Sequence, residues 1–297
     1  MQRSRLPPIG PGWLVALALA AAAAAGCAAQ AGVPRRMRDW NRDYPPFTVI
    51  DNIHHVGSND IAIFLITTPA GHILLDSGFE ASVPRLRANV EKLGFRFADI
   101  KILLTSHAHI DHVQAHAAVR RVTGAEVVVA RADAPVIESG GRGEPVFDGV
   151  YSWPPCTVDR VIDDGATVTL GGTTLTARVT PGHTRGATTW TTVVRAGGRM
   201  LNVVFFPSAN VNEGVRLIGN PRYPEIADDF RRSYGIWKAL PCDVFLADHG
   251  HFFAMEDKAD ALRAHPAAAN PFIDPDGYRA FIAQAEQRFD RQLAHER

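Results

Sequence analysis

Short apolar runs of strand length alternate with helical stretches along most of this chain, and this alternation constrains its fold more than any other feature. In each half of the region from residue 47 onward, the strand-like runs come first and the helical stretches follow. Turn signals separate paired runs at 69–71 and at 196–198. No repeat of fixed period accompanies the pattern. The sequence therefore predicts one α/β domain in which two sheets pack face to face, with helices outside.

The individual elements follow from composition and turn residues. The expected strands are 61–67, 72–76, 100–105, 125–130, 158–162, 167–170, 173–179, 188–195, 199–206 and 243–247. The expected helices are 82–94, 111–122, about 224–239, 256–264 and 275–294. The Gly- and Pro-rich stretch 139–155 is expected to be a loop, and loops of this length are either functional or disordered.

Charge and composition exclude several classes of protein. The 297 residues include 31 Lys+Arg and 31 Asp+Glu, so no net field would attract nucleic acid or an acidic membrane. The 46% hydrophobic and 21% charged residues are typical of a soluble globular protein.

The first 26 residues are expected to be a signal peptide. Arg3 and Arg5 precede an apolar run over 13–25, which is shorter than the ~20 residues of a membrane-spanning helix. Two cleavage sites compete. In the first, cleavage occurs just before Cys27, which follows Ala-Ala-Gly and would be the lipidated residue of a lipoprotein. In the second, ordinary cleavage occurs after Ala29. Either way we expect an exported protein, in the periplasm or anchored to the outer membrane as a lipoprotein.

Residues 27–46 are polar and are expected to form an N-terminal arm or tether before a domain spanning 47–297. Trp40 and Tyr44 in this arm would either reach a cleft of the domain or belong to a simple tether. Apart from Cys27 the chain has only Cys156 and Cys242, which would form one disulfide or remain two separate thiols.

A cluster of potential metal ligands follows the apolar run 100–105. His107, His109, Asp111 and His112 lie within six residues, where a strand ends and its side chains spread into a cleft. In an extended segment His107 and His109 point the same way, because side chains two apart share a face. Imidazole and carboxylate groups suit zinc.

Two distant histidines stand in the same position relative to their strands. His183 follows the strand 173–179, and His249 follows 243–247, with His251 as the weaker candidate beside it. Three strand-end loops that each carry imidazole would converge on one edge of the sandwich. The sequence therefore predicts a metal centre at that edge.

These residues resemble the metallo-β-lactamase superfamily, whose His-x-His-x-Asp-His signature is complete at 107–112. Other stretches resemble class B, subclass 3 β-lactamases: GHTRGATTW (182–190), NVVFFPS (202–208), GNPRYPEIADDFRRSY (219–234) and LPCDVFL (240–246). The resemblance covers about residues 45–290. It implies an αββα sandwich with two mixed β-sheets and helices on the outer faces.

The resemblance also implies a role for each ligand candidate. The first zinc would be bound by His107, His109 and His183. The second would be bound by Asp111, His112 and His249. Asp76 would brace the ligand loops by hydrogen bonds, although the cap of a hairpin end is an equally good interpretation of that residue.

The chain departs from the family pattern in two places. Relatives hold the substrate carboxylate with two serines, whereas this chain has Ser208 and then Asn210, whose amide can still donate a hydrogen bond. The disulfide that relatives form from the segment around Cys242 has no partner here, since no cysteine follows it.

The implied function is hydrolysis of the amide bond of β-lactam antibiotics, which confers resistance, by a monomeric enzyme. Two zinc ions per chain would share a water and generate hydroxide without a protein base, and Asp111 would orient this water or accept its proton. Phe147, Tyr151 and Trp153 in the loop 139–155 would wall the substrate, unless that loop is ordinary surface. Alternatives are an exported lactone or thioester hydrolase of the same fold, an iron oxygenase, or a zinc-binding protein without activity.

Overall fold

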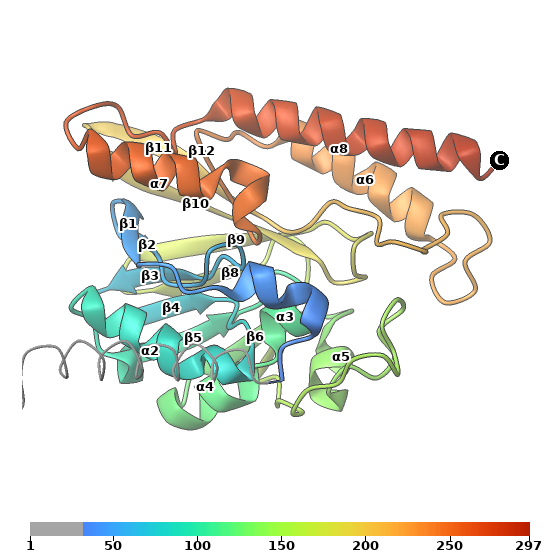
Figure 1. Cartoon of the computed structure of the whole chain (residues 1–297), viewed down its shortest axis with the longest axis horizontal. Helices are drawn as coiled ribbons and strands as arrows, with labels where there is room; N and C mark the ends of the chain where they lie inside the picture. Colours follow the sequence, from blue (N-terminus) through green and yellow to red (C-terminus); the bar gives the residue numbers. More distant parts are fainter. Residues whose placement is uncertain (1–31) are drawn as a thin grey trace, which may run out of the picture.

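The computed structural model describes residues 32–297, so the expected signal peptide 1–26 and Cys27 lie outside the described residues. Within the described part, no helix is both long and apolar enough to cross a membrane. The chain forms four layers, with two sheets between two layers of helices (Figure 1). This confirms the αββα sandwich expected from the sequence.

Each sheet mixes parallel and antiparallel pairs. The first sheet has the order β1-β2-β3-β4-β5-β6-β7 and turns parallel from β4 onward. The second has the order β12-β11-β10-β9-β8, with β11 and β12 parallel. The strands of the first sheet are β1 Phe47–Ile50, β2 Ile53–His55, β3 Phe64–Thr68, β4 Gly71–Leu75, β5 Ile100–Leu104, β6 Glu126–Ala130 and β7 Arg160–Ile162. Those of the second sheet are β8 Thr167–Leu170, β9 Thr173–Val179, β10 Thr188–Ala196, β11 Arg199–Phe206 and β12 Val244–Ala247.

Helices cover both outer faces. The first sheet is covered by α2 and α4, and the second by α6, α7 and α8 (Figure 1). Their bounds are α2 Val83–Lys92, α3 Ile110–Val113, α4 His116–Thr123, α5 Ala134–Ser139, α6 Ile226–Ala239, α7 Met255–Ala264 and α8 Pro275–His295.

Side chains alternate between the two faces of each strand and so fill two separate hydrophobic cores. Along β3, Phe64 and Ile66 face the second sheet, whereas Leu65 between them faces the helices under the first sheet. Trp190 of β10 lies fully buried between the sheets, and its indole N–H donates to the carbonyl of Thr105 at 3.0 Å. This bond fastens the second sheet to the chain just after β5, where the ligand loop begins.

One expected helix is divided. The sequence predicts a single helix over 111–122, but α3 ends at Val113 and α4 begins at His116. The reason is that the carbonyl of His112 accepts from the backbone N–H groups of Ser77 and Gly78, at 2.9 and 3.2 Å, so the helical hydrogen bond that it would otherwise accept is replaced. The break ties the ligand segment to the chain that follows β4.

Other departures are smaller. The short helix α5 is not among the predicted helices; it precedes the loop 139–155 and is capped by Gly140 with φ of 71°. Cys156 and Cys242 are both free thiols, which selects the second of the two alternatives. The N-terminal segment carries a 3-10 turn at Arg35–Asn41, with Met37 buried against the first-sheet core.

Candidate metal centre

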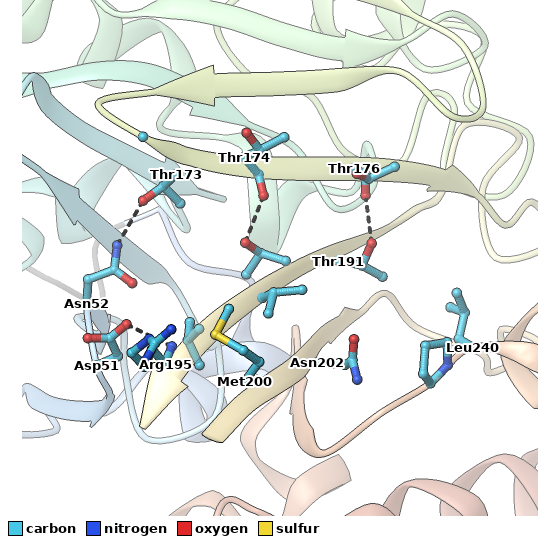
Figure 2. Close-up of a pocket in the computed structure, with 15 residues that line it drawn as sticks. Asp51, Asn52, Thr173, Thr174, Thr176, Thr191, Arg195, Met200, Asn202 and Leu240 are labelled. Carbon is cyan, nitrogen blue, oxygen red and sulfur yellow. Dashed lines mark hydrogen bonds between the residues drawn. The ribbon is translucent and has the colours of Figure 1, made fainter. Parts of the chain in front are cut away.

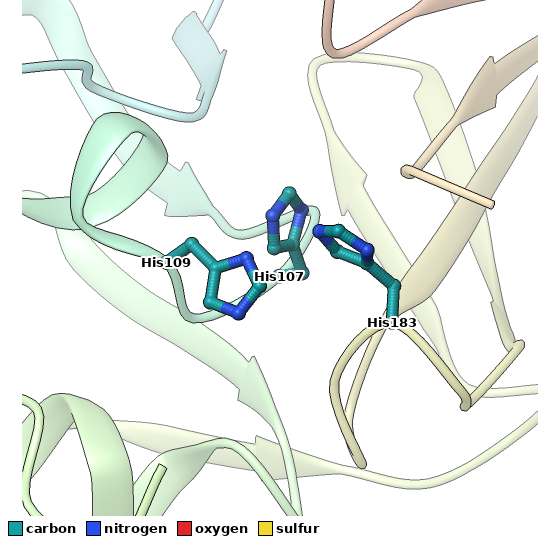
Figure 3. A group of neighbouring side chains, drawn as sticks. All are labelled: His107, His109 and His183. Atoms are coloured by element: carbon teal, nitrogen blue, oxygen red, sulfur yellow. The ribbon is translucent and has the colours of Figure 1, made fainter. Parts of the chain in front are cut away.

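The predicted ligands come from three loops that follow strand ends at one edge of the sandwich. His107, His109, Asp111 and His112 follow β5, His183 follows β9, and His249 follows β12. Figure 3 shows that the rings of His107, His109 and His183 face one another across the gap between two of these loops. All six side chains are buried.

The six side chains form two groups, and the donor atoms within each lie within 4.8 Å of one another. In the first group, the ring centres of His107, His109 and His183 are 4.6 to 4.7 Å apart. In the second group, Nε2 of His112 lies 3.3 Å from Nε2 of His249, and each of these atoms is 3.6 Å from Oδ2 of Asp111.

In the first group, one nitrogen of each ring is engaged outside the group. Nδ1 of His107 lies 3.3 Å from Oδ2 of Asp248, and Nδ1 of His183 lies 2.7 Å from the carbonyl of Asn210. Nε2 of His109 lies 3.4 Å from Glu144. These acceptors fix the N–H on the outer nitrogen, so the inner nitrogen of each ring presents a lone pair to the group.

The second group repeats this arrangement. Nδ1 of His112 lies 3.2 Å from Oδ2 of Asp76, and Nδ1 of His249 lies 3.1 Å from Oδ2 of Asp60. The two Nε2 atoms and the Asp111 carboxylate then point lone pairs at one another, which is unfavourable unless a proton or a metal ion lies between them. The residues of both groups therefore fit a metal ion.

Asp76 braces the loop after β5. It stands just after β4 with φ of 65°, and its carboxylate accepts from the backbone N–H and the hydroxyl of Ser106, at 2.7 and 2.6 Å. The same carboxylate meets His112, so one side chain holds both ends of the ligand segment. This is more than the cap of a hairpin end.

The electrostatics differ between the groups. Burial and the neighbouring His112 hold the pKa of His107 well below its usual value, and burial and His109 do the same to the pKa of His183. Burial opposes the charged form of His112, but Asp111 and the hydrogen bond from Asp76 outweigh it and raise its pKa to about 10. In the metal-free protein the second group therefore holds a proton where a metal would bind.

A cavity of about 360 Å³ opens over both groups. All of the six ligand candidates except His112 line it, together with Ser208 and Asn210. Its walls include Arg36, Met37, Trp40, Phe147 and Phe252. Trp40 thus reaches the cleft, where its ring is 5.3 Å from His249, whereas Tyr44 packs on Phe47 away from it.

The loop 139–155 contributes to the cavity through one of its three candidate aromatic residues. Phe147 lies 5.1 Å from His109, ring centre to ring centre. The rings of Tyr151 and Phe147 are tilted by 54° with their centres 5.4 Å apart, and the guanidinium of Arg36 lies over both rings at 5.3 Å. Trp153 is instead buried in the core under the first sheet.

Size alone does not identify the site. A larger groove of about 680 Å³ runs over β9, β10 and β11, lined by Asn52, Arg195 and several threonines (Figure 2). Its hydroxyl groups already bond within the wall, as Thr192 does to the carbonyl of Thr174 at 2.8 Å. None of the ligand candidates lines this groove.

Four carboxylates at the centre are not predicted from the sequence: Asp60, Asp133, Glu144 and Asp248. Asp133 accepts from the backbone of Ala108 and Gly186 and from the hydroxyl of Thr184, all within 2.8 to 2.9 Å, and so joins two ligand loops. Asp60 also bonds Nδ1 of His251 at 2.8 Å, which leaves His251 behind His249 with a side chain 57% exposed.

Comparisons with known proteins place the chain among enzymes. A model described as the metallo-beta-lactamase superfamily matches residues 57–193. A curated relative, a probable metallo-hydrolase of Burkholderia pseudomallei, is 32% identical over 116 residues, 37% of this chain; the match spans only 36% of that relative's length.

Two solved structures match over nearly their whole length. The FEZ-1 metallo-β-lactamase of Legionella gormanii has a TM-score of 0.84 and 40% identity, covering 86% of this chain and 98% of that one. BJP-1, a subclass B3 metallo-β-lactamase of Bradyrhizobium japonicum, has a TM-score of 0.81 and 39% identity, covering 88% and 97%.

Proposed function

Because this chain belongs to the metallo-β-lactamase superfamily, we propose that it is a zinc-dependent β-lactamase with two metal ions per chain. One observation carries the proposal: five buried histidines each engage one ring nitrogen with an outer acceptor and turn the other toward one of two adjoining donor groups. That arrangement holds the imidazole ligands in fixed orientation and leaves one nitrogen of each ring for a metal ion.

The six donors would divide as the family pattern implies. His107, His109 and His183 would hold the first zinc, and Asp111, His112 and His249 the second. Imidazole and carboxylate ligands suit zinc, and three protein ligands per ion leave a position open, as in catalytic rather than structural sites. This argues against a zinc-binding protein without activity.

Zinc bound there would polarise the β-lactam carbonyl and lower the pKa of a bound water toward neutrality. The chain's own residues would orient the water and the substrate and would exclude solvent from the reacting bond. Asp111 lines the cavity beside the second group and can accept a proton from the attacking water. Asn210 lines the cavity and can donate its amide N–H to the carboxylate that β-lactams carry beside the ring nitrogen. Phe147 and Trp40 form apolar walls that shield the reacting bond.

The biological setting is part of the proposal. With the sequence 1–26 acting as a signal peptide, the enzyme would meet β-lactams outside the cytoplasm, as a monomer in the periplasm or tethered to the outer membrane through Cys27. Hydrolysis there would protect the cell from these antibiotics.

Hydrolysis of a chromogenic cephalosporin by the purified protein tests the proposal. We expect turnover that stops when a chelator removes the metal and returns when zinc is added. Bound zinc at two ions per chain without turnover of any penicillin, cephalosporin or carbapenem would refute the β-lactamase and favour a lactone or thioester hydrolase with the same centre.

A further inference from the structure

We infer that Ser208 acts on the metal centre through Asp248, as a positioning residue, in place of the direct contact with a substrate carboxylate that its family counterpart makes. The inference rests on the proposed metal centre but does not depend on which substrate the enzyme hydrolyses.

Asp248 lies at the junction of three segments. It is 3% exposed and stands between the end of β12 and His249. Its backbone N–H donates to the carbonyl of Phe206 at 3.0 Å, and its carbonyl accepts from the N–H of Ala62 at 2.8 Å. The side chain therefore starts from a fixed point between the two sheets.

A single carboxylate oxygen of Asp248 serves two partners. Oδ2 lies 3.3 Å from Nδ1 of His107 and 2.9 Å from Oγ of Ser208. The other oxygen, Oδ1, is buried and has no hydrogen-bond partner among the described residues. The orientation of the carboxylate toward His107 thus depends on Ser208 as its second donor.

The hydroxyl of Ser208 has one hydrogen to give. An ionised carboxylate only accepts, so this hydrogen goes to Asp248. A substrate carboxylate beside Ser208 would then meet the lone pairs of its oxygen and the negative charge of Asp248 behind it. This leaves the amide of Asn210, two residues further on, as the donor that the loop offers to substrate.

We therefore expect Ser208, in the loop after β11, to affect how tightly the first metal ion binds. Without the hydroxyl of Ser208, Oδ2 of Asp248 keeps only two histidines, Nδ1 of His107 at 3.3 Å and Nε2 of His112 at 4.0 Å, and the carboxylate is free to turn away. The outer nitrogen of His107 then keeps only the hydroxyl oxygen of Ser106, at 3.2 Å, so the imidazole is held less firmly. Loss of such an outer partner costs about 10- to 100-fold in metal affinity.

The test is a zinc titration against a competing chelator, without substrate, on the full-length wild-type protein and on Ser208→Ala, Asp248→Asn and the double variant. We expect zinc affinity to fall about 10- to 100-fold in Asp248→Asn and several-fold in Ser208→Ala. The double variant should be no worse than Asp248→Asn alone, because both changes break one linkage. Unchanged affinity in Ser208→Ala, or additive losses, would overturn the inference.

Two further variants keep the result interpretable. Ser208→Thr retains the hydroxyl and should restore zinc affinity, which also covers the case in which Asp248→Asn fails to fold. Asn210→Ala is the matched control on the same loop: it should raise KM while zinc affinity stays at the wild-type value. The cobalt-substituted protein adds a spectroscopic measure, since its visible absorption should change in Ser208→Ala but not in Asn210→Ala.

Discussion

Asp111 is the residue that links the two histidines of the second donor group. Its Oδ2 is 3.6 Å from the inner nitrogens of both His112 and His249, and it is the only carboxylate of the second group. Burial opposes its charge, but His112 and His249 outweigh burial and lower its pKa, so it is ionised over the whole working range of pH.

Replacing Asp111 by Asn keeps the size of the side chain and removes its charge. We expect bound zinc to fall from two ions to one per chain, and turnover to fall roughly 10²- to 10⁴-fold, since both a ligand and the proton acceptor are lost. Metal analysis and steady-state kinetics measure the two effects. Two tightly bound zinc ions in this variant would contradict the ligand assignment.

The charge of His112 makes zinc binding depend on pH. With its pKa at about 10 in the metal-free protein, His112 is protonated at neutral pH, and zinc must displace that proton. The affinity of the second group should therefore rise up to tenfold for each unit of pH between neutrality and about 10. Calorimetry in buffers of different ionisation enthalpy should detect about one proton released per second zinc; release of none would show that His112 is neutral beforehand.

At the scale of residues, the sequence predicts those metal ligands that lie close together along the chain. His107 to His112 could be identified because four ligands lie within six residues after an apolar run. The carboxylates that orient them could not, because Asp60 is 189 residues from His249 and a lone Asp carries no spacing signal. Asp248 offered one clue, its place beside His249, but its contact with Ser208 exists only once β11 and β12 pair.

At the scale of elements, strands were predicted better than the break between α3 and α4. Turn residues mark the hairpins on either side of 69–71 and 196–198, and the observed pairs β3–β4 and β10–β11 follow them closely. The helix break is invisible in the sequence because it arises from Ser77 and Gly78, which approach the carbonyl of His112 only when β4 and β5 lie side by side.

The helix α5 contributes to the metal centre through the residue at its N-cap position. Asp133 stands at its N-cap position but makes no capping bond; its carboxylate instead holds the loops that carry His109 and His183. Gly186 allows this contact, because a Cβ there would lie 2.6 Å from the backbone nitrogen of Asp133.

We therefore expect Asp133→Ala to cost at least about 3 kcal/mol in the free energy of unfolding, because it leaves three buried donors without an acceptor. It should also weaken binding of the first zinc. Urea unfolding and zinc titration measure these effects. The matched control is Asp163→Ala, which removes an exposed carboxylate paired with Arg131 and should lower the free energy of unfolding far less than Asp133→Ala does. Equal losses in the two variants would remove the joining role from Asp133.

At the scale of the whole molecule, the first sheet and its flanks bury histidines that the metal centre does not use. His54, His55 and His116 are at most 6% exposed. Burial lowers the pKa to about 4 for His54 and His116 and to about 3 for His55. His54 and His55 lie far from the cluster 107–112 in the sequence, but His116 lies only four residues after His112. All three link the stability of the fold to pH.

The direction in which pH changes the stability follows from the pKa values of these histidines in the folded and unfolded states. The folded pKa values lie below the unfolded value of about 6.5, so between about 6.5 and 4 the unfolded chain binds protons that the folded chain does not. Stability from these residues is complete above about pH 6.5 and falls as the pH is lowered. Each histidine contributes up to about 1.4 kcal/mol per pH unit while the pH lies between its folded and unfolded pKa values.

Replacing His55 by Leu isolates the contribution of one histidine to the pH dependence of stability. Both ring nitrogens of His55 lack a hydrogen-bond partner among residues 32–297, and its ring lies against Phe47 and Phe64, so leucine removes a titrating group without breaking a bond. In urea unfolding of the zinc-free protein, the free energy of unfolding should fall less steeply between about pH 6.5 and 5 in His55→Leu than in the wild type, by up to about 1.4 kcal/mol per unit. Parallel pH profiles for the two proteins would mean that His55 is not held neutral by the fold, and that the acid sensitivity comes from the ligand histidines alone.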